Sequence, residues 1–271
     1  MKIAEFTLAG AMAVAAAALS AGCFDNKEAP RQAPEARSAE ALSKCDRAAL
    51  ERLLLRGRVT EAELSAPGFF AGLPALKELD LAETGIAAVP AAVADGSLGA
   101  LEHLYLGENP RLAELPPSLF SKNPNLEYLN LDRSGVTNLP AALGDASRLR
   151  WLRLNGTGVR SLPDSTAKLK DLRRIYAQGC KLSAVPPQLE GMEKLEDIVL
   201  DGNKEIAEFP GWIAALPSIR NISLGGTKIE KLPDDLGGLA KLSTLTLTGC
   251  PLPMEERHRI RKALPSVSIQ F

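Results

Sequence analysis

The sequence has few of the residues from which catalytic and metal sites are built. It contains two histidines, His103 and His258, and four cysteines among 271 residues. Neither histidine stands at metal-ligand or catalytic-triad spacing from a cysteine, a serine or a carboxylate cluster. We therefore expect no enzyme activity, no bound metal and no cofactor.

An excess of charge of one sign is also missing. The 32 lysines and arginines nearly balance the 33 aspartates and glutamates, which leaves a net charge of −1. Proteins that bind nucleic acid usually carry a basic excess, because neutralising phosphates supplies much of their affinity. Nucleic acid is therefore not an expected partner.

No apolar run is long enough to span a bilayer as a helix. The longest, from Thr7 to Leu19, has about 13 residues, against the roughly 20 that a spanning helix needs. One lysine precedes this run, and Ser-Ala-Gly follows it directly before Cys23. This layout predicts a signal peptide over residues 1–22.

The small residues before Cys23 resemble the bacterial lipobox, at which a peptidase cuts before a cysteine whose thiol carries lipid. The resemblance implies that Cys23 is the lipid attachment residue. Because Phe24 rather than aspartate follows, it also implies the outer membrane of a bacterial cell envelope, on either its periplasmic or its outer side. Secretion without lipid and a retained anchor are the alternatives. The Ala-, Pro-, Glu- and Arg-rich stretch that completes residues 23–43 is expected to be a disordered tether.

A repeat occupies most of the remaining chain. The stretch Leu149 to Asp171 has the pattern L-x-x-L-x-L-x-x-T-x-V-x-x-L-P, and aligned copies begin at Leu76, Leu101, Leu126, Leu149, Leu172, Leu195, Ile219 and Leu242. The copies are 23 to 25 residues apart. A fixed period of this size predicts a solenoid, because one unit cannot bury its apolar side without neighbours.

These motifs resemble those of leucine-rich repeat proteins, in the short bacterial class with Leu-Pro in the convex half of each unit. The resemblance implies an α/β solenoid, a horseshoe with a parallel β-sheet on its concave face. It also implies a ladder of buried polar residues three positions after the last strand leucine. These positions hold Thr84, Asn109, Ser134, Thr157, Cys180, Asn203, Thr227 and Cys250.

The segments on either side of the eight repeats, which cover residues 76–250, are expected to be caps. Residues 44–75 should form an N-terminal helical cap and a degenerate repeat, with a helix from Cys45 to Arg56 that has Leu50, Leu53 and Leu54 on one face. Residues 251–271 should form a C-terminal cap with a helix over 251–264 and a further strand in the last five residues.

The repeat register argues against disulfides. Cys180 and Cys250 stand three units apart, which places them about 14 Å from one another at a strand spacing of about 4.8 Å. Cys45 lies in the N-terminal cap. We expect these three cysteines to be free thiols.

Alternation along each short strand places leucines in the core and the intervening residues on the concave face. Aromatic residues and arginines are concentrated there in the second to fifth units. The candidate binding residues are Tyr105, Tyr128, Arg133, Arg150, Trp151, Arg153, Arg173, Arg174 and Tyr176. Such residues are enriched in interface hot spots, although ordinary cross-strand pairs on an exposed sheet are the alternative.

The sequence thus predicts a monomeric, lipid-anchored, non-enzymatic interaction module of the cell envelope that binds a protein or peptide on its concave sheet. A binder of glycan or peptidoglycan fragments is one alternative. An exported effector or adhesin that recognises a host protein is another.

Overall fold

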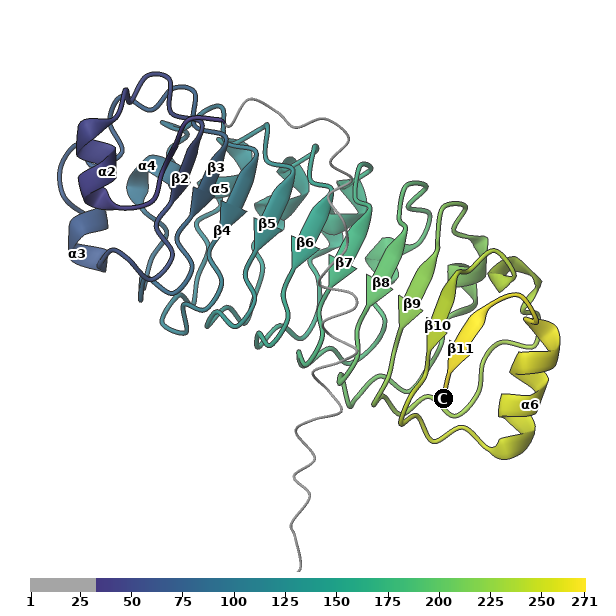
Figure 1. Cartoon of the computed structure of the whole chain (residues 1–271). Coiled ribbons are helices and arrows are strands. Elements are labelled where there is room, and N and C mark those ends of the chain that lie inside the picture. The colour runs from purple at the N-terminus through teal and green to yellow at the C-terminus, as the bar shows by residue number, and fades with distance from the viewer. Residues whose placement is uncertain (1–32) are drawn as a thin grey trace, which may run out of the picture. The chain divides into compact units, whose positions relative to one another are not determined.

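The computed structural model describes residues 33–271, and within them a single parallel sheet of eleven strands runs from one end to the other (Figure 1). Each strand pairs with its neighbour in the chain. The strands are β1 (Glu35–Ala36), β2 (Arg52–Leu54), β3 (Glu78–Asp80), β4 (His103–Tyr105), β5 (Tyr128–Asn130), β6 (Trp151–Arg153), β7 (Arg174–Tyr176), β8 (Asp197–Val199), β9 (Asn221–Ser223), β10 (Thr244–Thr246) and β11 (Ser268–Gln270).

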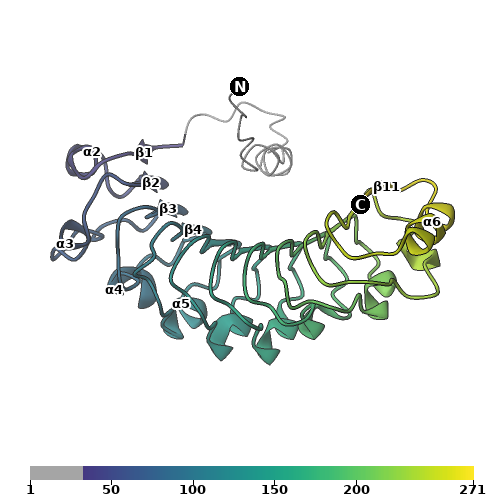
Figure 2. The ribbon, with the colours of Figure 1, turned by 90° about the horizontal axis from the view of Figure 1, so that it is seen from below.

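The side of each repeat opposite the sheet carries a short helix. The stacked repeats therefore curve with the sheet inside and the helices outside (Figure 2). These helices are α4 (Ala91–Ala94), α5 (Ser118–Ser121), η1 (Ala141–Asp145), η2 (Asp164–Lys168), η3 (Pro187–Leu189), η4 (Gly211–Ala215) and η5 (Gly237–Leu239). Proline directly precedes most of them, as at Pro140, Pro163 and Pro210. Its fixed φ and missing donor suit the entry to a short helix.

The strands are in one-to-one register, which stacks equivalent apolar side chains into one core. Leu79 is opposite Leu104, Leu104 opposite Leu129, and Leu129 opposite Leu152. These central strand residues are fully buried. The expected parallel-sheet horseshoe is confirmed.

The ladder of buried polar residues is present and joins neighbouring units. The side-chain nitrogen of Asn109 donates to the carbonyls of Leu81, 2.9 Å away in the preceding unit, and of Leu106, 3.0 Å away in its own unit. Its side-chain oxygen accepts from the backbone nitrogen of Gly85 at 2.8 Å. Cys180 fills the same position with its thiol 3.0 Å from the carbonyl of Leu154.

The expected helix from Cys45 to Arg56 is wrong. Helix α2 (Ala39–Lys44) ends before Cys45, and residues 52–54 form strand β2. Leu50, Leu53 and Leu55 are fully buried at the leucine positions of a strand motif. Leu50, Leu53 and Leu54 have the spacings of a helix face, whereas Leu50, Leu53 and Leu55 have those of the L-x-x-L-x-L motif, and pairing with β3 selects the strand.

The fold also begins before the expected boundary at residue 44. Strand β1 pairs with β2, and Ser38 caps α2 by accepting a hydrogen bond from the Ala41 nitrogen. Leu42 is buried against the core. The expected tether is therefore wrong for residues 35–43, while the signal peptide and Cys23 lie outside the described residues.

The N-terminal end continues through α3 (Glu61–Leu64), where Thr60 and Glu63 form a capping box. At the other end, α6 (Met254–Ala263) and β11 form the expected helix and strand, and β11 pairs with β10. Cys45, Cys180 and Cys250 are free thiols, as predicted. None of the helices in residues 33–271 is long and apolar enough to cross a membrane.

Candidate binding surface on the concave sheet

Strand register arranges the outward side chains of the sheet in two rows. The first row contains Glu78, His103, Tyr128, Trp151, Arg174 and Asp197. The second contains Asp80, Tyr105, Asn130, Arg153 and Tyr176. The parallel pairing places equivalent residues about 4.8 Å apart, within reach of one another's side chains.

Four rings from strands β4 to β6, those of His103, Tyr105, Tyr128 and Trp151, make an aromatic cluster. The Tyr105 and Tyr128 ring centroids are 4.8 Å apart, and Tyr128 meets Trp151 at 5.6 Å with an interplanar angle of 81°. His103 approaches Tyr128 edge-on at 6.0 Å. Burial raises the pKa values of the Tyr105 and Tyr128 hydroxyls, so both remain neutral donors.

Two of the predicted arginines stack on rings. The Arg174 guanidinium lies 5.3 Å from the Trp151 centroid, and the Arg153 guanidinium lies 5.3 Å from the Tyr176 centroid. Both also face carboxylates. Arg153 donates from two nitrogens to Asp132 at 2.9 and 2.7 Å, and Arg174 lies 3.2 Å from Asp197.

The remaining predicted arginines lie at the ends of the strands and are also paired. Arg133 reaches Glu108 at 2.9 Å, Arg150 reaches Glu127 at 3.0 Å and Arg173 reaches Glu196 at 3.2 Å. The structure therefore brings the predicted residues onto one face but balances each arginine with an acid. A binding role for these arginines stays a prediction, whereas their contacts are those of cross-strand pairs.

Sequence reasoning did not include Asp80 in the site. Its side-chain oxygen accepts from the Ala82 nitrogen at 2.9 Å, and no ion pair with it is formed within residues 33–271. Burial is the main cause of its raised pKa. Asp80 lies opposite Tyr105 on the next strand, so a carboxylate that forms no ion pair within residues 33–271 borders the aromatic cluster.

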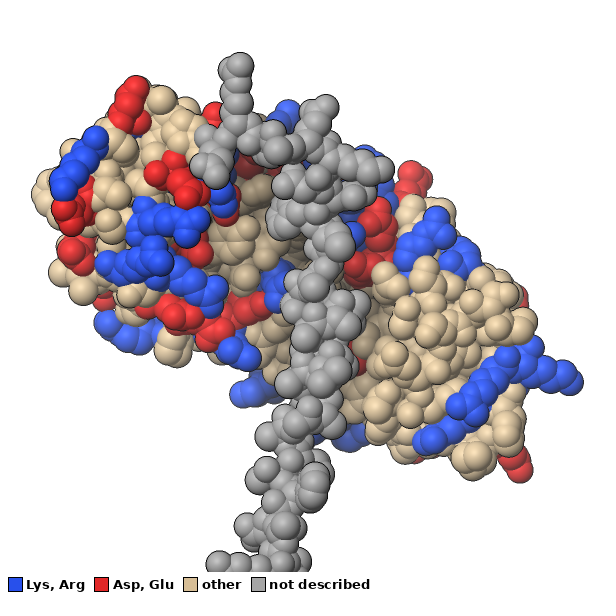
Figure 3. All heavy atoms as spheres, viewed as in Figure 1, with Lys and Arg blue, Asp and Glu red and all other residues tan. Residues whose placement is uncertain are grey.

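Charge is unevenly distributed over the molecule. Figure 3 shows acidic and basic atoms crowded together over β2 to β5, while the surface over β10 and β11 is largely uncharged up to the basic side chains of α6. Thr244, Thr246, Ser268 and Gln270 provide the outward residues of these last strands. The two ends of the sheet therefore suit different chemistry.

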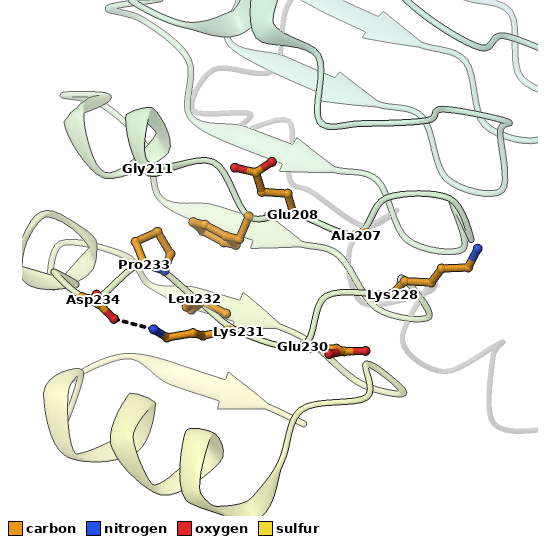
Figure 4. A pocket seen from close by; sticks show the side chains of 10 residues that line it. Ala207, Glu208, Gly211, Lys228, Glu230, Lys231, Leu232, Pro233 and Asp234 are labelled. Carbon is orange, nitrogen blue, oxygen red and sulfur yellow. Dashed lines mark ion pairs between the residues drawn. The ribbon is translucent and has the colours of Figure 1, made fainter.

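A shallow hollow of about 740 Å³ lies away from the strands, between the segments 207–211 and 228–234 (Figure 4). Its rim carries both signs of charge, and Lys231 pairs with Asp234 across 2.7 Å. Within the described part of the chain, no three histidine, cysteine or acidic side chains gather as a metal site would require. The concave sheet thus remains the candidate surface.

Comparisons with known proteins agree with this geometry. The leucine-rich repeat family matches residues 99–159. A leucine-rich repeat protein of Leptospira interrogans superposes with a TM-score of 0.62 at 23% identity, covering 83% of this chain and 73% of its own. An internalin of Listeria monocytogenes gives a TM-score of 0.65 at 22% identity, covering 83% of this chain and 74% of its own.

A third similar structure is the leucine-rich repeat ectodomain of a receptor kinase from Arabidopsis thaliana, in complex with Casparian strip integrity factor 2. It has a TM-score of 0.59 at 24% identity and covers 75% of this chain, which spans only 24% of the receptor chain. A search of curated proteins finds no match. The repeat pattern, the open parallel sheet and these likenesses together show that the chain folds as a leucine-rich repeat horseshoe.

Proposed function

We propose that this protein is a lipid-anchored interaction module of the bacterial cell envelope that binds a protein or peptide on its concave sheet. The aromatic cluster on β4 to β6 is the observation that carries the proposal. Tyrosine and tryptophan combine a large apolar contact area with a hydrogen-bonding group, which is why they dominate interface hot spots.

The fold supports the same proposal. A solenoid presents a long, regular surface of side chains on a rigid sheet, and leucine-rich repeats typically act as interaction scaffolds without chemistry of their own. The similar plant receptor ectodomain is itself in complex with Casparian strip integrity factor 2. The rigid register of strands β4 to β6 would hold the rings in place before a partner arrives, which lowers the entropy cost of binding.

Membrane attachment through Cys23 is part of the proposal and has its own test. Mass spectrometry of the native protein should find Cys23 as the first residue, carrying lipid. A Cys23→Ala variant should leave the membrane fraction. Retention of residues 1–22, or membrane binding by Cys23→Ala, would contradict lipid anchoring without touching the role of the sheet.

The partner can be identified by proximity labelling in the native envelope and then tested with purified protein. Tyr128→Ala and Trp151→Ala should each weaken binding of that partner by about 30-fold or more, the size of a hot-spot loss of about 2 kcal/mol. Thr246→Ala, on the same face at the C-terminal end, should change affinity little. Equal losses for all three variants would place the site elsewhere.

The alternatives give different results in the same experiments. Affinity for purified cell-wall glycan without a protein partner would select a glycan binder. Loss of the domain when intact cells are shaved with protease would show surface exposure, which an adhesin or effector needs. The first result would replace the protein-partner proposal, and the second would make a host protein the expected partner.

A further inference from the structure

Three residues with charged side chains hold an unusual backbone conformation beside the aromatic cluster. Glu83, Glu108 and Arg133 have φ angles of 60°, 56° and 53°. Each follows its strand by three residues, at the ends of β3, β4 and β5. The equivalent positions after β2 and after β6 to β10 are all glycines with positive φ, namely Gly57, Gly156, Gly179, Gly202, Gly226 and Gly249.

Glycine adopts this left-handed conformation without strain, whereas a residue with a Cβ pays about 1–2 kcal/mol. Lack of space does not explain why only three units have a residue other than glycine at this position. A Cβ added at Gly179 would meet nothing within 4 Å. Glu83 and Glu108 do form ion pairs, with Arg56 and Arg133, but Arg56, Glu83 and Arg133 are more than half exposed. Exposed pairs contribute little. We interpret the strain as the cost of presenting these side chains at the rim.

The same strands hold a carboxylate that forms no ion pair within residues 33–271. On the face around β1 to β3, the carboxylates of Glu35, Glu78 and Glu83 are paired with Arg37, Arg52 and Arg56. Asp80 is half-buried, accepts one backbone hydrogen bond and forms no ion pair within residues 33–271, although Arg56, which pairs with Glu83, also acts on it and favours its charged form. A half-buried carboxylate whose neighbouring arginine is already paired with another acid is further stabilised by an arriving cation.

Aromatic rings stand beside this carboxylate. Tyr105 is opposite Asp80, and Tyr128 packs against Tyr105 at 4.8 Å. A lysine or arginine side chain has an aliphatic stem that packs on rings and a charged end that pairs with a carboxylate or with a ring face. The strained rim, the carboxylate of Asp80 and the rings therefore converge on strands β3 to β5.

We propose that strands β3 to β5 receive a basic side chain of a peptide partner, with its charged group at Asp80, its stem on Tyr105 and Tyr128, and Glu83 and Glu108 at the rim. This assignment rests on the proposed function and specifies the chemistry of the partner. It moves the centre of the site from the arginines of β6 and β7, which are already paired, toward the N-terminal part of the sheet.

The test uses two capped tripeptides, Ala-Lys-Ala and the same peptide with its lysine amine acetylated, titrated into the folded protein and followed by NMR. The lysine peptide should shift the ring signals of Tyr105 and Tyr128, and the neutral peptide should bind at least tenfold more weakly. Asp80→Asn should lower affinity for the lysine peptide at least tenfold. The amide oxygen of Asn can still accept from the Ala82 nitrogen, so the turn is kept.

Glu208→Gln is the matched control, because it removes one negative charge from the exposed rim of the hollow in Figure 4 and leaves the sheet unchanged. It should bind the lysine peptide like the unaltered protein. A second measurement avoids any mutation: the lysine peptide should lower the pKa of the Asp80 carboxyl, because a nearby cation favours the ionised form.

Equal binding of the two peptides, equal binding by Asp80→Asn, shifts confined to β6 to β8, or no response at all would overturn this inference. Such results would leave the concave sheet as a partner surface if Trp151→Ala still weakened the partner found by labelling. Loss of both would reject the proposed function as well.

Discussion

Asparagines at the ladder position, Asn109 and Asn203, join their units to the ones before them. Asn109 is fully buried and pairs with the carbonyls of Leu81, Leu106 and Gly107 and with the backbone nitrogen of Gly85. Asn109→Ala should therefore lower the free energy of unfolding by about 2–4 kcal/mol, since several buried groups lose their partners together. Urea denaturation measures this change.

Cys180 is the comparison for that prediction, because its thiol makes weaker hydrogen bonds at the same position. Cys180→Ala should cost about 1 kcal/mol, mostly through lost packing. A loss as large as that of Asn109→Ala would mean that the ladder acts through volume and not through hydrogen bonds.

The strained rim gives a second residue-scale prediction. Glu83→Gly and Glu83→Ala both remove the ion pair with Arg56, so the difference between them isolates the backbone term at φ 60°. The glycine variant should be more stable than the alanine variant by about 0.5–1 kcal/mol in thermal or urea unfolding, less than the full strain because glycine also gives the unfolded chain more conformational freedom. Equal stability would remove the argument that the rim is strained.

These residues differ in how visible they are in the sequence. The ladder and the core leucines repeat in every unit, so their positions could be predicted. The strain at Glu83 could not be predicted. The identity of one charged residue does not show that the equivalent residues of other units are glycines with positive φ. Asp80 was predictable as an outward acid, but its lack of an ion-pair partner depends on where Arg52 and Arg56 point.

At the scale of elements, strand β6 has one residue that stabilises the core and, next to it, one that is a candidate for binding. Leu152 is fully buried, whereas Trp151 faces outward and stacks with Arg174. Leu152→Ala should lower unfolding free energy by about 2–5 kcal/mol, and Trp151→Ala by about 1 kcal/mol. Melting curves of the two variants decide this, and a larger loss for Trp151→Ala would contradict the outward orientation of that row.

Helix α6 is attached to the last units through a carboxylate. Glu256 accepts from the backbone nitrogen of Leu232 at 2.8 Å and from two nitrogens of Arg259 at 2.7 and 2.8 Å. The hydrogen bonds from Arg259 lower the pKa of Glu256. A depressed pKa means that this stabilisation is present above about pH 4.5, the ordinary range of a glutamate, and is lost as the pH falls through the lower folded value.

Hydrogen exchange at the Leu232 amide should therefore accelerate below about pH 4, relative to a strand amide in the middle of the sheet. Glu256→Gln should remove most of this pH dependence, because the amide cannot be protonated in that range. Identical acid profiles for both proteins would show that another group controls the C-terminal cap.

The element most poorly predicted from sequence was the first one. Leu50, Leu53 and Leu54 fit a helix face, yet Leu53 is in the core and Leu54 is on the concave side of β2. Periodicity over so few residues cannot separate the two structures, and only pairing with β3 resolves it. The C-terminal cap was predicted well because α6 has acids at its start, bases at its end and a strand one period after β10.

For the whole molecule, the repeat made the fold predictable because every unit has the same leucine pattern. The centre of the binding surface was less predictable, since aromatic and basic residues could be counted but their pairing could not. Each arginine proposed as a contact turned out to face a carboxylate, as Arg150 faces Glu127 and Arg173 faces Glu196. Composition along a strand gives the residues of a surface, and only the folded structure shows which of its charged groups are paired.

The one-to-one register has a consequence for how such a chain can change over generations. The ladder asparagines, Asn109 and Asn203, bond carbonyls of their own unit and of the preceding one, so equivalent units offer their neighbours the same backbone groups. Duplication or loss of one unit-length stretch of the gene, such as the codons for residues 149–171, should therefore leave both ends able to dock. The distance between the acidic end and the hydroxyl-bearing end would then lengthen or shorten by about one strand spacing of 4.8 Å. Recombination could in this way fit the same two ends to partners of different length.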